Sequence, residues 1–95
     1  GSKMETIKLS KPLMIKGEET KEVKLDFNSL TGKQLIEAER EARLKGDQTP
    51  SVFLSMTFQA IVAGKLIGVL ADDIEDLPAT DFRNLVMPVA NFLLG

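Results

Sequence analysis

The residues with the most potential for chemistry form one acidic cluster, Asp72-Asp73-Ile74-Glu75-Asp76, with Asp81 a few residues further on. Carboxylate oxygens are the hard ligands that Ca²⁺ and Mg²⁺ prefer. The cluster lacks the alternating ligand spacing and the central glycine of an EF-hand loop, so a solvated loop between two helices is the other interpretation. Both stay open at this point. The first would make the chain a metal-dependent hydrolase that uses Asp72, Asp73, Asp76 and Asp81.

Other chemistry is largely excluded by composition, because the 95 residues include no His, Cys, Trp or Tyr. Imidazole bases, thiol nucleophiles, disulfides and the standard zinc ligand sets are therefore absent. Gly32-Lys33 and Gly64-Lys65 do not form phosphate loops, because Phe27 and Gln59 stand where the earlier glycine is needed. We accordingly expect no catalytic residues, no cofactor and no metal, and a protein that works by binding or assembly.

Charge and hydropathy argue against two classes of partner. Residues 51–95 contain only two cationic groups, Lys65 and Arg83, so the clustered basic face that nucleic acids require is not expected. The longest apolar stretch, residues 52–71, is interrupted by Gln59 and Lys65 among other polar groups, and a membrane-spanning segment would expose them to lipid. We expect a buried helix there, with neither a nucleic acid nor a membrane as partner.

The first element predicted is a β-hairpin over about residues 6–27, in which apolar residues fall on odd positions on both sides of a turn. The turn is expected at residues 16–20, with Gly17 free to take a positive φ. Pro12 cannot donate to a ladder and either lies at an edge or breaks its strand. The apolar face must cover the helices that follow or pair with a strand of another chain.

The helices that should follow span about residues 31–45, 50–64 and 78–94, with a short turn of helix near 69–76 as an optional fourth. The fold class is therefore α+β, mainly α. The first helix has a capping-box pattern at Thr31 and Gln34, and it ends at Gly46. Its polar face offers two i,i+4 ion pairs, Glu39 with Arg43 and Glu41 with Lys45.

The second helix is expected to begin with Thr49 as N-cap and Pro50 at its first position. Nine of the twelve residues from Val52 to Ala63 are apolar, which is typical of a central core helix. Gly64 is the predicted stop, and a continuation to Gly68 is the alternative.

The last helix carries an amphipathic stripe whose spacing is helical. Asp81 would complement the helix dipole in its first turn. Pro88 should kink the helix, so that the tail points away from the main axis. The stripe consists of Phe82, Leu85, Val86, Val89, Phe92 and Leu93.

As to domain organisation, residues 4–95 are expected to form a single domain. Gly1-Ser2-Lys3 is expected to be the remnant of an expression tag.

Taken in this order, the segments resemble the tail assembly chaperone family of long-tailed bacteriophages, over residues 6–94. The matching segments are Ile7-Lys8-Leu9-Ser10-Lys11-Pro12, Gly17-Glu18 ahead of Val23-Lys24-Leu25, Leu30-Thr31-Gly32-Lys33-Gln34-Leu35 running into Glu39-Arg40, and Leu77-Pro78-Ala79-Thr80-Asp81-Phe82 followed by Leu85, Val89 and Phe92-Leu93.

The resemblance implies a non-enzymatic protein of a phage or prophage that binds the tape measure protein and helps recruit tail tube subunits. It would act in the cytoplasm of the bacterial host, be absent from the mature virion, and have the capacity to form a homo-oligomer. The partner-binding residues we expect are Phe82, Leu85, Val89, Phe92 and Leu93; the alternative is that this stripe packs on the second helix. A small dimeric adaptor unrelated to phage is the rival function.

Overall fold

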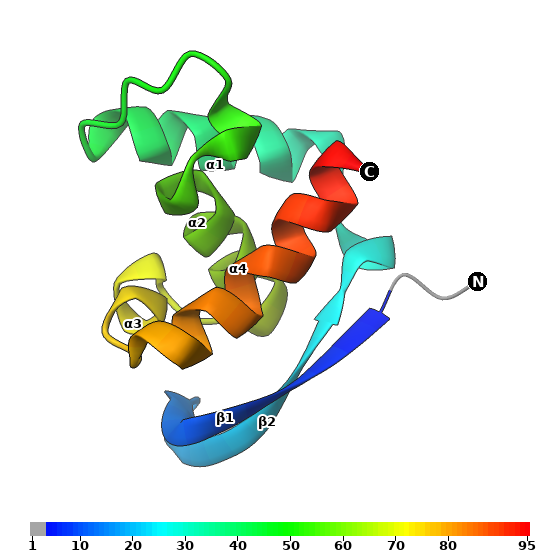
Figure 1. Cartoon of the computed structure of the whole chain (residues 1–95), viewed down its shortest axis with the longest axis vertical. Helices are drawn as coiled ribbons and strands as arrows, with labels where there is room; N and C mark the ends of the chain where they lie inside the picture. The colour runs from blue at the N-terminus through cyan, green and yellow to red at the C-terminus, as the bar shows by residue number, and fades with distance from the viewer. Residues whose placement is uncertain (1–3) are drawn as a thin grey trace.

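The computed structural model describes residues 4–95, so the expected tag remnant at 1–3 lies outside the described residues. An antiparallel β-hairpin precedes four helices, which confirms the α+β, mainly α class (Figure 1). The elements are β1 (Met4–Ile15), β2 (Glu18–Asp26), α1 (Gly32–Leu44), α2 (Met56–Ile67), α3 (Ala71–Glu75) and α4 (Ala79–Leu94), with short 3-10 turns η1 (Phe27–Ser29) and η2 (Val52–Leu54).

The hairpin covers one side of the helices, which is one of the two arrangements expected for its apolar face. Its turn is tighter than predicted, because only Lys16 and Gly17 lie between the strands, with φ angles of 52° and 83°. Positive φ at both central residues is what a two-residue type I′ turn requires. One face of the hairpin is buried against the helices through Ile7, Leu9, Leu13, Val23 and Leu25.

The break expected at Pro12 is present as an irregularity in the strand pairing. Lys8 pairs with Glu22 and Leu13 pairs with Thr20, so the four residues of β1 from Leu9 to Pro12 face only Lys21 of β2. This long bulge frees backbone amides of β1 from the ladder. Two of them, at Ser10 and Lys11, are used by α4, as described below.

Helix α1 confirms both predicted ends. The Thr31 hydroxyl accepts from the Gln34 amide, the Gln34 side chain accepts from the Thr31 amide, and Gly46 takes a φ of 96° just beyond the last turn. The pair of Glu39 with Arg43 is formed at 3.4 Å.

The predicted pair of Glu41 with Lys45 is wrong, because both side chains find partners on other elements. Glu41 pairs with Lys65 of α2 at 3.3 Å, and Lys45 pairs with Asp72 of α3 at 2.7 Å. Tertiary packing therefore redirects this part of the polar face of α1 toward its neighbours.

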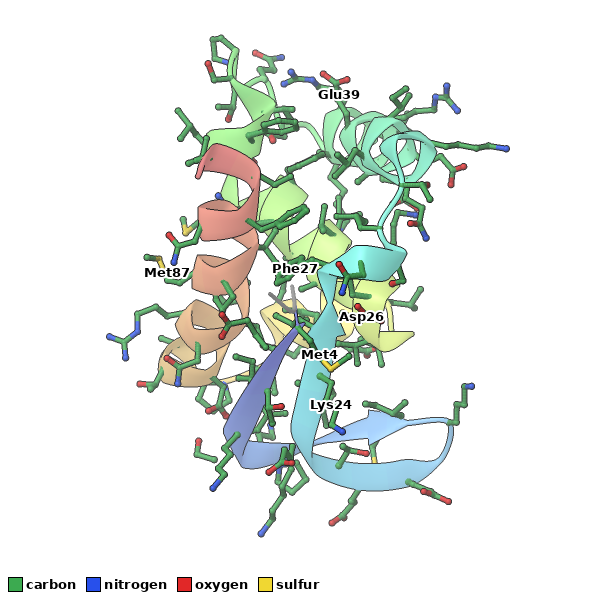
Figure 2. The ribbon with its side chains drawn as sticks, turned by 90° about the vertical axis from the view of Figure 1, so that its right-hand side faces the viewer. Met4, Lys24, Asp26, Phe27, Glu39 and Met87 are labelled. Atoms are coloured by element: carbon green, nitrogen blue, oxygen red, sulfur yellow. The ribbon has the colours of Figure 1, made fainter. Side chains whose placement is uncertain are left out.

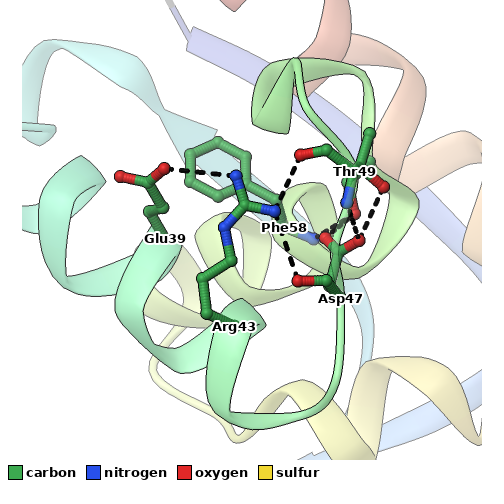
Figure 3. A network of polar contacts seen from close by, with 6 residues as sticks. Glu39, Arg43, Asp47, Thr49 and Phe58 are labelled. Carbon is green, nitrogen blue, oxygen red and sulfur yellow. Dashed lines mark hydrogen bonds and ion pairs between the residues drawn. The ribbon is translucent and has the colours of Figure 1, made fainter.

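The predicted start of the second helix at Thr49-Pro50 is also wrong, since α2 begins at Met56 with Ser55 as its N-cap. The Asp47 carboxylate accepts from the amide and hydroxyl of Thr49 and from the Ser55 hydroxyl. Arg43 donates to the carbonyls of Asp47 and Thr49, at 3.2 and 2.7 Å (Figure 3). This network holds the loop between α1 and η2. Helix α2 therefore begins only after the 3-10 turn η2.

The predicted stop at Gly64 is replaced by the alternative at Gly68, which has a φ of 94° and caps α2. Gly64 lies inside the helix because the chain returns against it: a Cβ there would stand 2.7 Å from the Val69 carbonyl oxygen. The prediction that this helix is central is confirmed, since α2 contacts α1, α3, α4 and β2 and is buried from Phe58 to Gly64.

Helix α4 continues through Pro88 to Leu94, so the proline does not end it. The kink expected at Pro88, with the tail pointing away from the main axis, stays a prediction. The Phe92 ring stacks on Phe27 with centroids 4.7 Å apart, and Leu93 packs against the core. These contacts hold the end of α4 beside η1, which directly follows β2.

Candidate partner surface

The acidic cluster does not form a metal site. Asp72 and Glu75 accept from the Lys45 ammonium, and the hydrogen bond that Lys45 donates to Asp72 raises the pKa of Lys45 above its usual value. Asp73 accepts from the Leu70 amide at the start of α3. Within residues 4–95, no three side chains of His, Cys, Asp or Glu come together in a group able to hold a metal ion. The four proposed ligands are therefore not assembled by the fold.

Asp81 lies apart from this cluster because it serves the hairpin. Its side chain is 1% exposed and accepts from the Ser10 amide at 2.9 Å, the Ser10 hydroxyl at 2.9 Å and the Lys11 amide at 3.0 Å. The hydrogen bond from the Ser10 amide, supported by the other two, lowers the pKa of Asp81 below that of a free aspartate. A charged group with this many donors ties α4 to β1 and leaves no free oxygen facing solvent.

The predicted partner-binding stripe is divided by its burial. Leu85 and Val89 are 0% exposed, which agrees with the alternative of packing in the core. Phe82 and Leu93 are partly buried against the core, and Phe92 is 36% exposed while stacked on Phe27. Partner binding by the stripe stays a prediction, and in the folded chain only Phe82, Phe92 and Leu93 have surface to offer.

A second apolar surface, which the sequence pattern did not lead us to predict, runs along the outer side of α4. One hollow of about 450 Å³ lies between the start of α2 and α4 and includes Met56, Phe82, Arg83 and Met87 in its lining. Another, of about 420 Å³, lies between η2 and the end of α4, and Leu54 and Leu94 are among its lining residues. We call the two hollows together the α4 groove.

Four large apolar side chains of the α4 groove are unusually exposed for their type. Met56 is 65% exposed, Leu54 60%, Leu94 57% and Met87 50%. Figure 2 shows Met87 pointing away from the other helices into solvent. Contiguous exposed apolar side chains mark binding surfaces more often than isolated ones do.

A sequence signal for this surface existed. Met87 lies five residues after Phe82, which places it about 140° around the helix from the start of the stripe. Leu94 follows Met87 by seven residues, two helical turns on, and so continues the same outer face. Large apolar residues on the side of an amphipathic helix opposite its stripe are the pattern that would have predicted a second contact surface.

The electrostatics of the α4 groove are simple, because Arg83 is the only charged residue in the lining of either hollow. Across the part of the chain that the structure describes, Arg83 forms no ion pair. A further hollow, of about 400 Å³ between α1, α2 and α3, has Leu44 and Leu70 in its lining, 83% and 71% exposed. Its lysines, in contrast, are already paired with Glu41 and Asp72.

None of the helices among residues 4–95 has the length and hydropathy needed to cross a membrane.

Comparison with known proteins connects this architecture to one family. Residues 6–94 match the sequence model of the family described as "Phage tail assembly chaperone proteins, E, or 41 or 14". No curated protein and no solved structure matches the chain. Since the match extends over nearly the whole sequence and includes the hairpin and all four helices, the chain belongs to this family of phage tail assembly chaperones.

Proposed function

We propose that the chain is a non-enzymatic chaperone that binds the tape measure protein of its phage or prophage and helps bring tail tube subunits to it. It acts in the cytoplasm of the bacterial host and leaves before the virion is complete. The observation that carries the proposal is the family match over residues 6–94. The fold is compatible with the proposal, because it leaves apolar side chains exposed that a client could cover.

The physical rationale lies in the surface that the folded chain leaves uncovered. Among residues 4–95, the α4 groove leaves four large hydrophobic side chains exposed by half or more: Leu54, Met56, Met87 and Leu94. An unassembled client that exposes apolar helical surface would aggregate, and transient cover by such side chains would prevent this. Release is then favoured when tube subunits offer the client a larger and more complementary interface.

Co-expression with the tape measure protein of the same phage tests the proposal. The tape measure protein should be largely insoluble alone and should remain soluble and co-purify when this chain is present. Multi-angle light scattering on the complex would give the stoichiometry, and adding the tail tube protein should yield a ternary complex. A tape measure protein that stays insoluble and a chain that elutes without it would contradict the proposal.

A further inference from the structure

We infer that the α4 groove is the docking site for one amphipathic helix of the client, and that this helix carries an acidic residue that meets Arg83. The inference deepens the proposed function, since it rests on that function for the identity of the client. Its own basis is the shape, residue content and charge of the groove. The tests below separate failure of the groove from failure of the function.

The dimensions of the groove fit a helix. Helix α4 lines the larger hollow from Ala79 to Met87 and the smaller one at Leu94, so the two hollows lie along fifteen residues or about 22 Å of helix. Leu54 lines the smaller hollow and Met56 the larger one, and these two residues flank the buried Ser55. A client helix of about four turns laid along α4 would therefore contact both hollows at once.

The side chains that line the groove favour a helical apolar face of variable sequence. Met87 and Leu94 are two helical turns apart and would meet apolar residues spaced i, i+3 or i+4, and i+7 on the client. Met56 of α2 and Met87 of α4 both line the larger hollow. Methionine is flexible and polarizable and adapts to different partners, which suits a chaperone that covers more than one segment of a long client.

Charge selects between a client helix and a second copy of this chain. Arg83 stands at one end of the groove without an ion-pair partner among residues 4–95. In an antiparallel pairing of two α4 helices through the same face, the residues meeting Arg83 would come from Thr80, Met87, Asn91 and Leu94, none of which is acidic. A client helix that places Asp or Glu there would neutralise the charge, so the client is the favoured occupant.

The four methionines of the chain provide a direct readout. Met56 and Met87 line the groove, whereas Met4 and Met14 lie on the hairpin and serve as internal controls. With the methionine methyl groups labelled with ¹³C, a synthetic 18-residue helical peptide with leucines on one face and one terminal glutamate is titrated in. The resonances of Met56 and Met87 should shift while those of Met4 and Met14 stay in place.

Two variants with matched controls test the groove in the full complex. Met87→Asp should weaken binding of the tape measure protein about tenfold or more, because it places a charge in the apolar contact. Its control, Ile36→Asp, alters an exposed apolar residue on α1 and should not weaken it. Arg83→Glu should weaken binding of the glutamate peptide about two- to fivefold and strengthen binding of the same peptide with lysine. The control Arg40→Glu should change neither.

The outcomes distinguish failure of the groove inference from failure of the proposed function. If the chain binds the tape measure protein and Met87→Asp leaves the affinity unchanged, the groove inference is wrong and the proposed function stands. If the hairpin methionines respond in place of Met56 and Met87, the docking site is elsewhere. If the Met87 resonance shifts with protein concentration alone while the mass doubles, the occupant is a second copy and the inference is overturned. Failure to bind the tape measure protein at all contradicts the proposed function, and the peptide titration then judges the groove by itself.

Discussion

The two sides of α4 are built from similar residue types and have opposite roles. On the inner side, Leu85 and Val89 are completely buried and Asp81 is bonded to the hairpin. On the outer side, Met87 and Leu94 are at least half exposed and Arg83 has no ion-pair partner among residues 4–95. One helix thus holds the fold together with one face and leaves the other available. Stability and binding should accordingly respond to different substitutions on the same helix.

The largest effect is expected at Leu85, which has no exposed surface. Leu85→Ala should lower the free energy of unfolding by about 2 to 5 kcal/mol, since it removes buried methyl groups and leaves a cavity between α4 and the core. Urea denaturation followed by circular dichroism measures this, and the midpoint should fall without a change in slope. A loss below about 0.5 kcal/mol would show that the inner side is not the structural one.

Asp81 is the polar counterpart on the inner side. Asp81→Asn keeps the shape of the side chain but turns an amide nitrogen, a donor, toward the donors of Ser10 and Lys11. The thermal midpoint should fall by roughly 5 to 15 °C. The control is Asp76→Asn, at an exposed carboxylate beyond α3, which should leave the midpoint nearly unchanged. Equal effects of the two variants would refute the structural role of Asp81.

The same carboxylate predicts how stability depends on pH. The Ser10 amide lowers the pKa of Asp81 in the folded state below the ordinary value of 3.8, and the Ser55 hydroxyl does the same for Asp47. Both groups therefore stabilise the fold above the unfolded-state pKa, and this contribution is lost as pH falls through the folded-state pKa. Unfolding free energy should be flat near neutral pH and decline below about pH 4. Asp81→Asn should reduce the steepness of this decline, and an unchanged slope would argue against the assignment.

Phe92 stands between the two sides, because it is 36% exposed yet stacks on Phe27. Phe92→Ala should cost about 1 to 2 kcal/mol, less than a fully buried aromatic residue, since it removes a stacked pair and part of a buried surface. Comparing Phe92→Ala with Leu85→Ala by calorimetry would place the boundary between the two sides. A cost equal to that of Leu85→Ala would assign Phe92 to the core.

The smallest effect on stability is expected at Met87. Met87→Ser removes an exposed side chain and should change the free energy of unfolding by no more than about 0.5 kcal/mol. Binding of the tape measure protein should nevertheless weaken, as proposed for the α4 groove. A variant that unfolds the protein would place Met87 on the structural side of the helix and remove the contrast.

Local patterns predicted those parts of the fold that depend on neighbours in sequence. The capping box at Thr31 and the central position of α2 followed from spacing alone. The start of α2 was mispredicted because the Asp47 carboxylate accepts hydrogen bonds from Thr49 and Ser55. Arg43 in turn donates to the Asp47 carbonyl. The interior position of Gly64 depends on the returning chain at Val69, which no helical pattern encodes.

The surface was harder to predict than the core. The stripe on α4 identified apolar residues correctly, but periodicity cannot tell which face a second helix will cover, and burial assigned Leu85 and Val89 to the interior. The role of Asp81 required knowing that residues 71 apart along the chain come together. A carboxylate beside other carboxylates suggested a metal ligand, whereas its partners are two backbone amides and a hydroxyl in the irregular part of β1.

The bond between Asp81 and β1 should also set the order in which the molecule opens. The amides of Ser10 and Lys11 lie in the bulged part of β1 and are protected by α4 instead. Their hydrogens can exchange with solvent only when α4 separates from the hairpin, so their exchange rates measure that opening directly. The two ends of the chain are therefore expected to detach in one cooperative event, and a bound client that holds α4 in place should slow deuterium uptake at both amides.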